Sequence, residues 1–136
     1  MDRQYDTLYA YLALARRPGS AGGGGEVDDR IRLLVRQLAA DRSGCRWCID
    51  RARHDWRARG LPVDLLGQLG RHDASTAFTE REHAALALVD WVACAAEAAA
   101  TPGETLARVR RHFSDRAMAE LVACLAEHHL IADVSQ

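Results

Sequence analysis

The sequence predicts an all-α protein folded as a single compact domain of six to seven helices. Apolar residues recur at the three- and four-residue spacing of helices along most of the chain, and no segment alternates like a strand. Helix-capping sequences mark several of the expected helix starts. The chain has 136 residues, of which 49% are hydrophobic, and this is enough to bury a proper core.

Residues 1–26 are expected to form an N-terminal helix and a glycine-rich connection. The helix should run from Gln4 to Arg17, where apolar side chains recur at helical spacing. The sequence PGSAGGGGE then interrupts the pattern, and the Gly-Lys-Ser/Thr of a phosphate-binding loop does not follow it. We interpret this stretch as a flexible connection.

Residues 27–136 are expected to form the main domain. Its first helix should span about residues 27–41, because four aliphatic side chains there make one apolar face. The Ser-Gly pair at 43–44 should end this helix and open another at 45–59. The sequence LPVDLLGQLG that follows predicts a short helix with proline in its first turn.

Three later helix starts carry capping residues. Thr79 with Glu82, and Thr101 with Glu104, have the spacing of capping boxes, and Ser114 precedes the last apolar periodic segment. The helix after Thr79 includes ALALVDWVACAAEAAA, which is apolar on most of its circumference. A helix of this kind is buried all round, either in the centre of the core or against another subunit, and we predict a homo-oligomer.

Composition excludes some function classes. The formal net charge is −1, so a general affinity for nucleic acid or for an anionic membrane is not expected. No apolar run approaches the roughly 18 residues that span a bilayer. The N-terminal residues lack the pattern of a signal peptide, and we expect a cytoplasmic protein.

The sequence SGCRWCIDRARH contains the clearest chemical signal. Cys45 and Cys48 lie at the expected start of a helix, where free amide N–H groups and the helix dipole favour a thiolate over a thiol. Arg42, Arg46 and Arg51 should add positive charge nearby. The three-residue spacing places both sulfurs on one helical face, close enough to form a disulfide.

Two other interpretations of this pair stay open. A zinc site usually takes four ligands, and the remaining cysteines, Cys94 and Cys124, lie in apolar, alanine-rich segments that predict buried small side chains. We therefore expect no metal. The pair could also be chemically inert, but close cysteines in a reducing compartment favour redox chemistry.

Three segments of the chain resemble the alkylhydroperoxidase D-like (AhpD-like), or carboxymuconolactone decarboxylase, family. They are RIRLLVRQLAADRSGCRWCIDRARHDWRARGLP, FTEREHAALALVDWV and HFSDRAMAELVACLAEHHLIA, and the resemblance covers roughly residues 28–133. It implies an all-α fold that assembles as trimers or hexamers, with an active site near a subunit interface. It implies no bound cofactor.

In the redox members of that family the CxxC pair reduces peroxides in an antioxidant role. The resemblance implies that Cys48 attacks the peroxide and Cys45 resolves the intermediate. Electrons come from a lipoyl- or thioredoxin-like partner. Other members are decarboxylases that act on lactones of aromatic catabolism, and these lack the cysteine pair.

The sequence departs from the redox pattern at two positions. The family has a histidine four residues after the second cysteine and a glutamate about a dozen residues before the first, and together these relay protons. Here the two positions are Ala52 and Leu33. General acid–base help is worth about 10²–10⁴-fold in rate, so we expect a poor peroxidase that can still exchange disulfides.

Other residues were considered as replacements for the relay. His54 should point away from both sulfurs, since it lies six residues after Cys48 on the same helix. Glu82 matches a family position but is explained by its capping role. Asp50 is expected to act as a first-turn dipole partner or to pair with Arg46 or Arg53. The acid–base candidates are His129, His128, His83, Glu82, Asp50 and His54. Trp47 is expected to form an apolar wall of the pocket. Arg46 is expected to line the pocket as well.

Three functions remain in view. The first is a thiol–disulfide oxidoreductase, similar to an alkylhydroperoxidase, that uses Cys45 and Cys48. The second is a decarboxylase, lyase or isomerase acting on a small organic acid or specialised metabolite on the same fold. The third is a non-catalytic oligomeric binding protein in which the cysteine pair is a remnant or a redox sensor.

Overall fold

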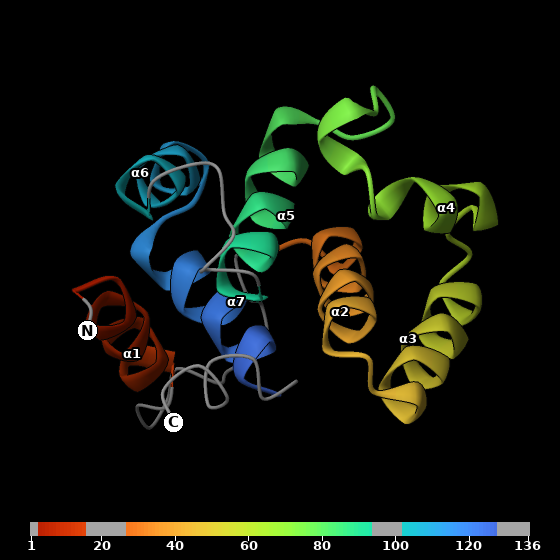
Figure 1. Cartoon of the computed structure of the whole chain (residues 1–136), viewed down its shortest axis with the longest axis horizontal. Helices are drawn as coiled ribbons and strands as arrows, with labels where there is room; N and C mark the ends of the chain where they lie inside the picture. Colours follow the sequence, from red (N-terminus) through yellow and green to blue (C-terminus); the bar gives the residue numbers. More distant parts are fainter. Residues whose placement is uncertain (1–2, 16–26, 94–101, 128–136) are drawn as a thin grey trace.

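The computed structural model describes residues 3–15, 27–93 and 102–127, and these residues are all-α, as predicted. Seven α-helices and two short 3-10 helices follow one another along the described chain (Figure 1). They are α1 (Arg3–Ala15), α2 (Asp29–Ser43), α3 (Arg46–Ala58), η1 (Val63–Leu65), α4 (Leu66–Leu69), η2 (His72–Ala74), α5 (Glu80–Ala93), α6 (Pro102–His112) and α7 (Asp115–Glu127). The predicted helix count is therefore confirmed.

The turn between α2 and α3 lies at the predicted Ser-Gly pair, residues 43–44. Gly44 ends α2 in the left-handed conformation, with φ +70°, and its amide donates to the carbonyl of Ala40 at 3.2 Å. A residue with a Cβ atom is strained at such a φ, which explains glycine here. The bounds of α2 and α3 differ from the expected 27–41 and 45–59 by at most two residues, as is usual at helix ends.

Two of the predicted caps are present as hydrogen bonds. The amide of Glu82 donates to Oγ1 of Thr79 at 3.1 Å, and the amide of Thr79 donates to Oε1 of Glu82 at 3.0 Å, which completes a capping box. The amide of Ala117 donates to Oγ of Ser114 at 3.1 Å. Thr101 lies outside the described residues.

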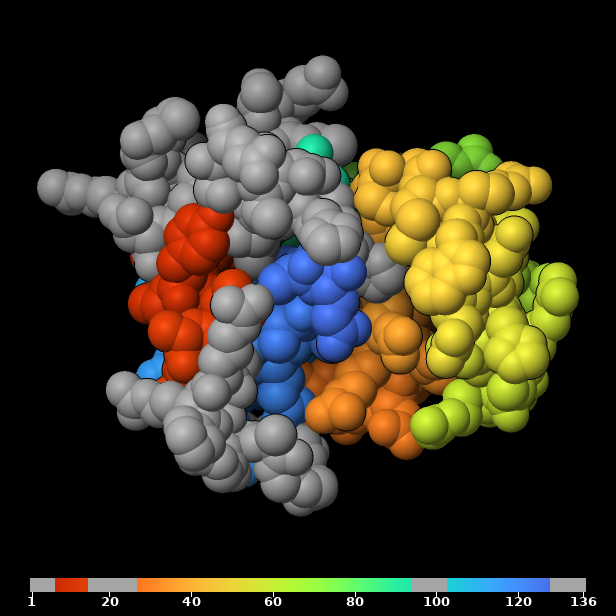
Figure 2. Space-filling view, turned by 90° about the horizontal axis from the view of Figure 1, so that it is seen from below, coloured from red at the N-terminus to blue at the C-terminus, as the bar shows by residue number. Residues whose placement is uncertain are grey.

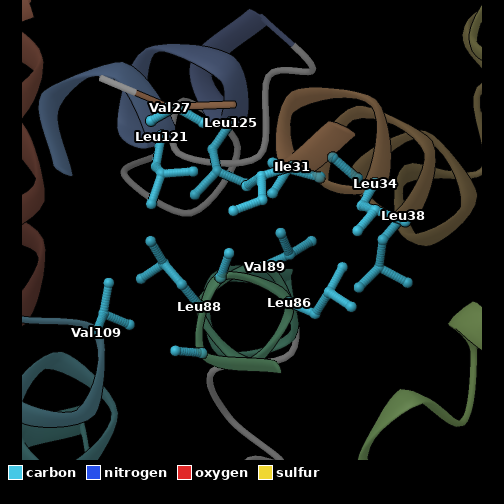
Figure 3. Close-up of a cluster of buried hydrophobic side chains, with 14 of the residues drawn as sticks. Val27, Ile31, Leu34, Leu38, Leu86, Leu88, Val89, Val109, Leu121 and Leu125 are labelled. Carbon is cyan, nitrogen blue, oxygen red and sulfur yellow. The ribbon is translucent and has the colours of Figure 1, made fainter. Parts of the chain in front are cut away.

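Helix α5 occupies the centre of the core. Nine of its fourteen residues are buried, and its leucine and valine side chains point toward α2, α6 and α7 (Figure 3). Residues such as Ile31 and Leu38 from α2, and Leu121 and Leu125 from α7, meet them there. A central position thus accounts for the apolar circumference of this helix, and a subunit contact is not needed to explain it.

Helix α3 lies at the edge of the molecule. Only Ala52 and Trp56 of its residues are buried, and Nε1 of Trp56 donates to the carbonyl of Pro62 at 2.9 Å. The helix packs antiparallel to α2, since Arg59 at its end reaches Asp29 at the start of α2, with Nη1 and Oδ2 3.0 Å apart. The α2–α3 segment forms one side of the molecular surface (Figure 2).

None of the helices in the described parts of the chain combines the length and hydropathy that crossing a bilayer requires.

Candidate active site

The two cysteines meet at the N-terminus of α3. Cys45 is the N-cap residue, with extended backbone angles of φ −76° and ψ 107°, and Cys48 lies in the first helical turn. They form a disulfide, and their Cα atoms are 5.2 Å apart. This separation falls within the range that disulfides adopt without backbone movement. Both residues are partly buried, so the disulfide lies at the surface.

One helix amide points at one of the two sulfurs. The N–H of Cys48 donates to Sγ of Cys45 at 3.2 Å, so the cap of α3 is a cysteine side chain. Ser43 holds the preceding turn, because its hydroxyl donates to the carbonyl of Ala40 at 2.9 Å and accepts from the amide of Cys45 at 3.4 Å. Because free N–H groups at a helix start stabilise negative charge, this arrangement favours a thiolate at Cys45.

Positive charge around the sulfurs is lower than the sequence suggested. Nε of Arg42 lies 2.8 Å from Oδ1 of Asp90, and Nε of Arg51 lies 3.8 Å from Oδ2 of Asp55. Arg42 is thus paired with a carboxylate, whereas Arg51 shares the carboxylate of Asp55 with Arg36, whose Nη2 lies 3.9 Å from the same Oδ2. Arg46 is exposed and makes no ion pair with any residue that the structure describes.

The space that a proton relay would need is apolar. Leu33 on α2 and Ala52 on α3 are both buried, with exposed fractions of 9% and 7%. One turn further along α2, Gln37 is completely buried, and its Nε2 donates to Oδ1 of Asp41 at 3.1 Å. A neutral amide does not exchange protons at physiological pH, so Gln37 does not replace the missing glutamate.

Two of the candidate acid–base residues have structural roles. Glu82 caps α5 and accepts a hydrogen bond from Nε of Arg30 at 2.6 Å. Burial by itself would raise the pKa of Glu82, but hydrogen bonds from Arg30 and Thr79, and the charge of Arg30, lower it below 4.5. Glu82 is therefore ionised at neutral pH and paired, as its capping role predicted. His83 is buried on α5, where its ring meets the edge of Phe78, with ring centroids 5.9 Å apart.

The candidates on α3 lie on its exposed surface. His54 is exposed, as expected for a histidine that points away from the sulfurs. Asp50 is the fifth residue of α3, outside the first turn, and among the described residues it pairs with neither Arg46 nor Arg53. The expected ion pair was therefore wrong. The carboxylate that forms ion pairs on this helix is Asp55 instead.

Trp47 does not line an enclosed pocket in the single chain. Its side chain is 71% exposed, directly between the two cysteines. The apolar wall predicted for this residue would require a second molecule to cover it.

Cys124 is a partly buried free thiol on α7. Burial and, to a lesser extent, the nearby Glu127 raise its pKa to about 11, so it is unreactive at neutral pH. Cys94, His128 and His129 lie outside the described residues.

Sequence reasoning missed His72, a buried histidine of η2 that contacts α5. His72 is 4% exposed, and its Nε2 lies 2.6 Å from Oδ2 of Asp90 on α5. Burial would raise the pKa of Asp90, but hydrogen bonds from His72 and Arg42, together with their charges, lower it below 3.8. The available signal was Asp90 itself, since an acid in a buried apolar helix needs a partner.

Metal binding finds no support in the described residues. Within them, no three side chains of the types His, Cys, Asp or Glu are grouped so that they could hold a metal ion.

Comparison with known proteins supports the fold. No protein-family model matches the sequence, and no curated protein matches it significantly. The chain is similar to a crystal structure of a protein of unknown function from Agrobacterium tumefaciens, for which the role of an antioxidant defence protein, AhpD, has been suggested. The TM-score is 0.63 at 23% sequence identity, and the match covers 97% of this chain and 86% of the other. The chain therefore has the AhpD-like fold that the sequence resemblance predicted.

Proposed function

We propose that this protein is a thiol–disulfide oxidoreductase that cycles Cys45 and Cys48 between dithiol and disulfide. The observation that carries the proposal is the Cys45–Cys48 disulfide at the start of α3, where a helix amide donates to one sulfur. A helix N-terminus is a position at which a thiol ionises readily. The AhpD-like fold adds support, because the similar protein has been suggested to act in antioxidant defence.

The cycle has an oxidative and a reductive half. In the first, a thiolate attacks a substrate disulfide or peroxide, a bond from its sulfur to one substrate half forms, the substrate S–S or O–O bond breaks, and the other half leaves as a thiolate or as an alkoxide that takes up a proton. The second cysteine then attacks the first sulfur, so that the Cys45–Cys48 disulfide forms and the remaining substrate half leaves with a proton. In the reductive half, an external dithiol reduces the Cys45–Cys48 disulfide by thiol–disulfide exchange, and the external dithiol is oxidised to a disulfide.

Peroxide reduction should be slow. A departing alkoxide or hydroxide needs a proton, and the two positions that would supply a relay are Leu33 and Ala52, both buried and apolar. Loss of general acid–base help costs about 10²–10⁴-fold in rate. We therefore propose a weak alkylhydroperoxidase.

Partner molecules belong to the proposal as well. A lipoyl- or thioredoxin-like dithiol is the proposed electron donor, since the disulfide lies at the surface. A homo-oligomer, as a trimer or hexamer, would bring a second chain toward the exposed Trp47. Such a contact would give this side chain the apolar surroundings that a large aromatic residue usually has.

The alternative of a decarboxylase, lyase or isomerase has less support in the described residues. A groove of about 390 Å³ lies between α1, α6 and α7. Its polar side chains pair with one another, since Tyr11 donates to Oδ1 of Asp115 at 3.0 Å and Nε of Arg110 donates to the Tyr11 hydroxyl at 3.2 Å. These groups are already engaged in the structure, and none of the described residues that line the groove is a histidine.

Turnover of two substrates tests the proposal. The reduced protein, Cys45→Ser, Cys48→Ser and the control Cys124→Ser are given dithiothreitol with either cystine or tert-butyl hydroperoxide. Consumption of cystine by the wild type and by Cys124→Ser, with a lower rate in at least one of the two CxxC variants, is the expected result. The proposal is rejected if the wild type and the two CxxC variants consume both substrates at the same rate.

A further inference from the structure

We infer that Cys45, and not Cys48, is the attacking thiol, and that its substrates are disulfides more than peroxides. This inference rests on the proposed redox function of the pair. It reverses the roles that the family resemblance implies, in which Cys48 attacks and Cys45 resolves.

The first observation is the asymmetry of hydrogen bonding at the helix start. Sγ of Cys45 accepts the N–H of Cys48 at 3.2 Å. Across the described residues, no donor reaches Sγ of Cys48. After reduction, a negative charge on Cys45 is therefore stabilised by a backbone N–H that is fixed by α3, and by the dipole of that helix. Within the described part of the chain, no N–H group donates to Sγ of Cys48 in this way.

The second observation concerns the surroundings of Cys48. One helical turn beyond it lies Ala52, which is 7% exposed, so Cys48 borders the apolar contact between α2 and α3. Leu33, at the position of the family glutamate, is buried as well. Without the relay, no described side chain acts as a base beside Cys48.

The third observation is the placement of uncompensated positive charge. Arg46 follows Cys45 directly in the chain and makes no ion pair with a described residue. Arg51 lies three residues after Cys48, and it shares the carboxylate of Asp55 with Arg36, at 3.8 Å and 3.9 Å. The arginine without a described ion-pair partner thus lies next to Cys45 in the chain.

The choice of substrate follows from the leaving group. When the Cys45 thiolate attacks a disulfide RSSR, a Cys45–SR bond forms, the substrate S–S bond breaks and RS⁻ leaves. Thiols have pKa values near 8.5, so RS⁻ leaves without a proton donor, whereas hydroxide, the conjugate base of the much weaker acid water, does not. Cys48 then attacks the Cys45 sulfur, a second RS⁻ leaves and takes up the Cys48 proton, and a dithiol reductant restores both thiols.

Two variants that each lack one cysteine of the pair test this assignment. Cys48→Ser keeps the proposed attacker, and Cys45→Ser keeps the proposed resolving residue, while serine is also a good helix N-cap. Each reduced variant is reacted with iodoacetamide between pH 5 and 10, and the modified cysteine is identified by peptide mass. Circular dichroism confirms that both variants are folded.

The expected rates follow from the thiolate population. Lowering the pKa of a thiol by one unit raises its thiolate fraction about tenfold at neutral pH and lowers the reactivity of that thiolate about threefold, a net gain of about threefold. Cys45 in Cys48→Ser should therefore be alkylated about three- to tenfold faster at pH 7 than Cys48 in Cys45→Ser, with a lower midpoint pH. Adding Arg46→Gln to Cys48→Ser should slow the alkylation of Cys45 and remove only part of the rate difference, because the N–H of the helix still donates to Cys45.

A disulfide probe supplies the second readout. With 5,5′-dithiobis(2-nitrobenzoate), Cys48→Ser should form a lasting mixed disulfide at Cys45, and the wild type should release two aromatic thiols and close its own disulfide. Equal or faster alkylation of Cys48, or faster turnover of tert-butyl hydroperoxide than of cystine, overturns the inference. Neither result contradicts the proposed redox cycle. The proposed function itself is rejected if the wild type does not form its Cys45–Cys48 disulfide.

Discussion

His72 and Asp90 share a short hydrogen bond of 2.6 Å between Nε2 and Oδ2. The other carboxylate oxygen of Asp90 lies 2.8 Å from Nε of Arg42, whose Nη2 also donates to the carbonyl of Gly70 at 3.2 Å. Since Asp90 is ionised, Nε2 of His72 carries the proton. This cluster fixes the end of α2, three residues before Cys45, to α5 and to the segment that leads to η2.

Replacing Asp90 should weaken this junction. The pKa of Asp90 is lower in the folded protein than its ordinary 3.8, so its contribution to stability is present above that value and is lost as the pH falls through the folded pKa. Asp90→Asn should lower the free energy of unfolding at pH 7 by about 1–2 kcal/mol, because an amide has one acceptor oxygen and either His72 or Arg42 loses its partner. Urea unfolding at pH 7 and pH 3 should show a smaller difference for the variant than for the wild type. An unchanged free energy and pH dependence would contradict a stabilising role.

Removing the cap of α5 should also destabilise the fold. Thr79→Ala loses the hydroxyl that accepts the amide of Glu82, at a cost of about 1 kcal/mol in the free energy of unfolding. Thr79→Ser keeps the oxygen and should remain within about 0.5 kcal/mol of the wild type. Equal losses in the two variants, measured by denaturant unfolding, would show that the methyl group matters and the cap does not.

Glycine is required at the turn that leads to the disulfide. Gly44 has φ +70°, and an added Cβ would meet no atom within 4 Å, so the cost of a side chain is conformational alone. Gly44→Ala should lower the free energy of unfolding by about 1–2 kcal/mol. Gly67 offers a matched control, because it is equally unobstructed and has no positive φ. Gly67→Ala should be neutral or stabilising by about 0.4–1 kcal/mol, and equal effects at the two positions would count against the account of the turn.

Restoring the proton relay should raise peroxidase activity. Leu33→Glu combined with Ala52→His places an acid–base pair on the facing helices α2 and α3, and we expect turnover of tert-butyl hydroperoxide to increase about 10–100-fold. The increase should disappear when Cys48→Ser is added, because the relay of the redox family serves the cysteine at that position. A folded double variant with wild-type turnover would show that the missing relay does not limit the reaction.

The local features of the fold were predictable from the sequence. Helical periodicity, the capping box at Thr79 and the glycine at position 44 act within one or two turns of chain, so their patterns can be read locally. The CxxC pair at the start of α3 was predictable for the same reason, because its spacing and its helix position are both local.

The charge pairing was not predictable in this way. Arg42 was expected to act on the sulfurs, but it binds Asp90, which lies 48 residues away in the sequence. His72 belongs to no motif, and only the packing of η2 against α5 buries its ring. Partners that come from distant segments depend on how helices pack, and the sequence of one helix does not specify that.

The central claim is that Cys45 and Cys48 form a disulfide reversibly. The most direct test reduces the protein with dithiothreitol, removes the reductant, adds one equivalent of cystine and maps the cysteines by peptide mass after alkylation. We predict that a Cys45–Cys48 cross-link replaces two alkylated thiols within minutes, and that dithiothreitol restores both thiols while Cys124 stays unchanged. If Cys45 and Cys48 remain alkylated as separate thiols, the pair does not cycle and the account is contradicted.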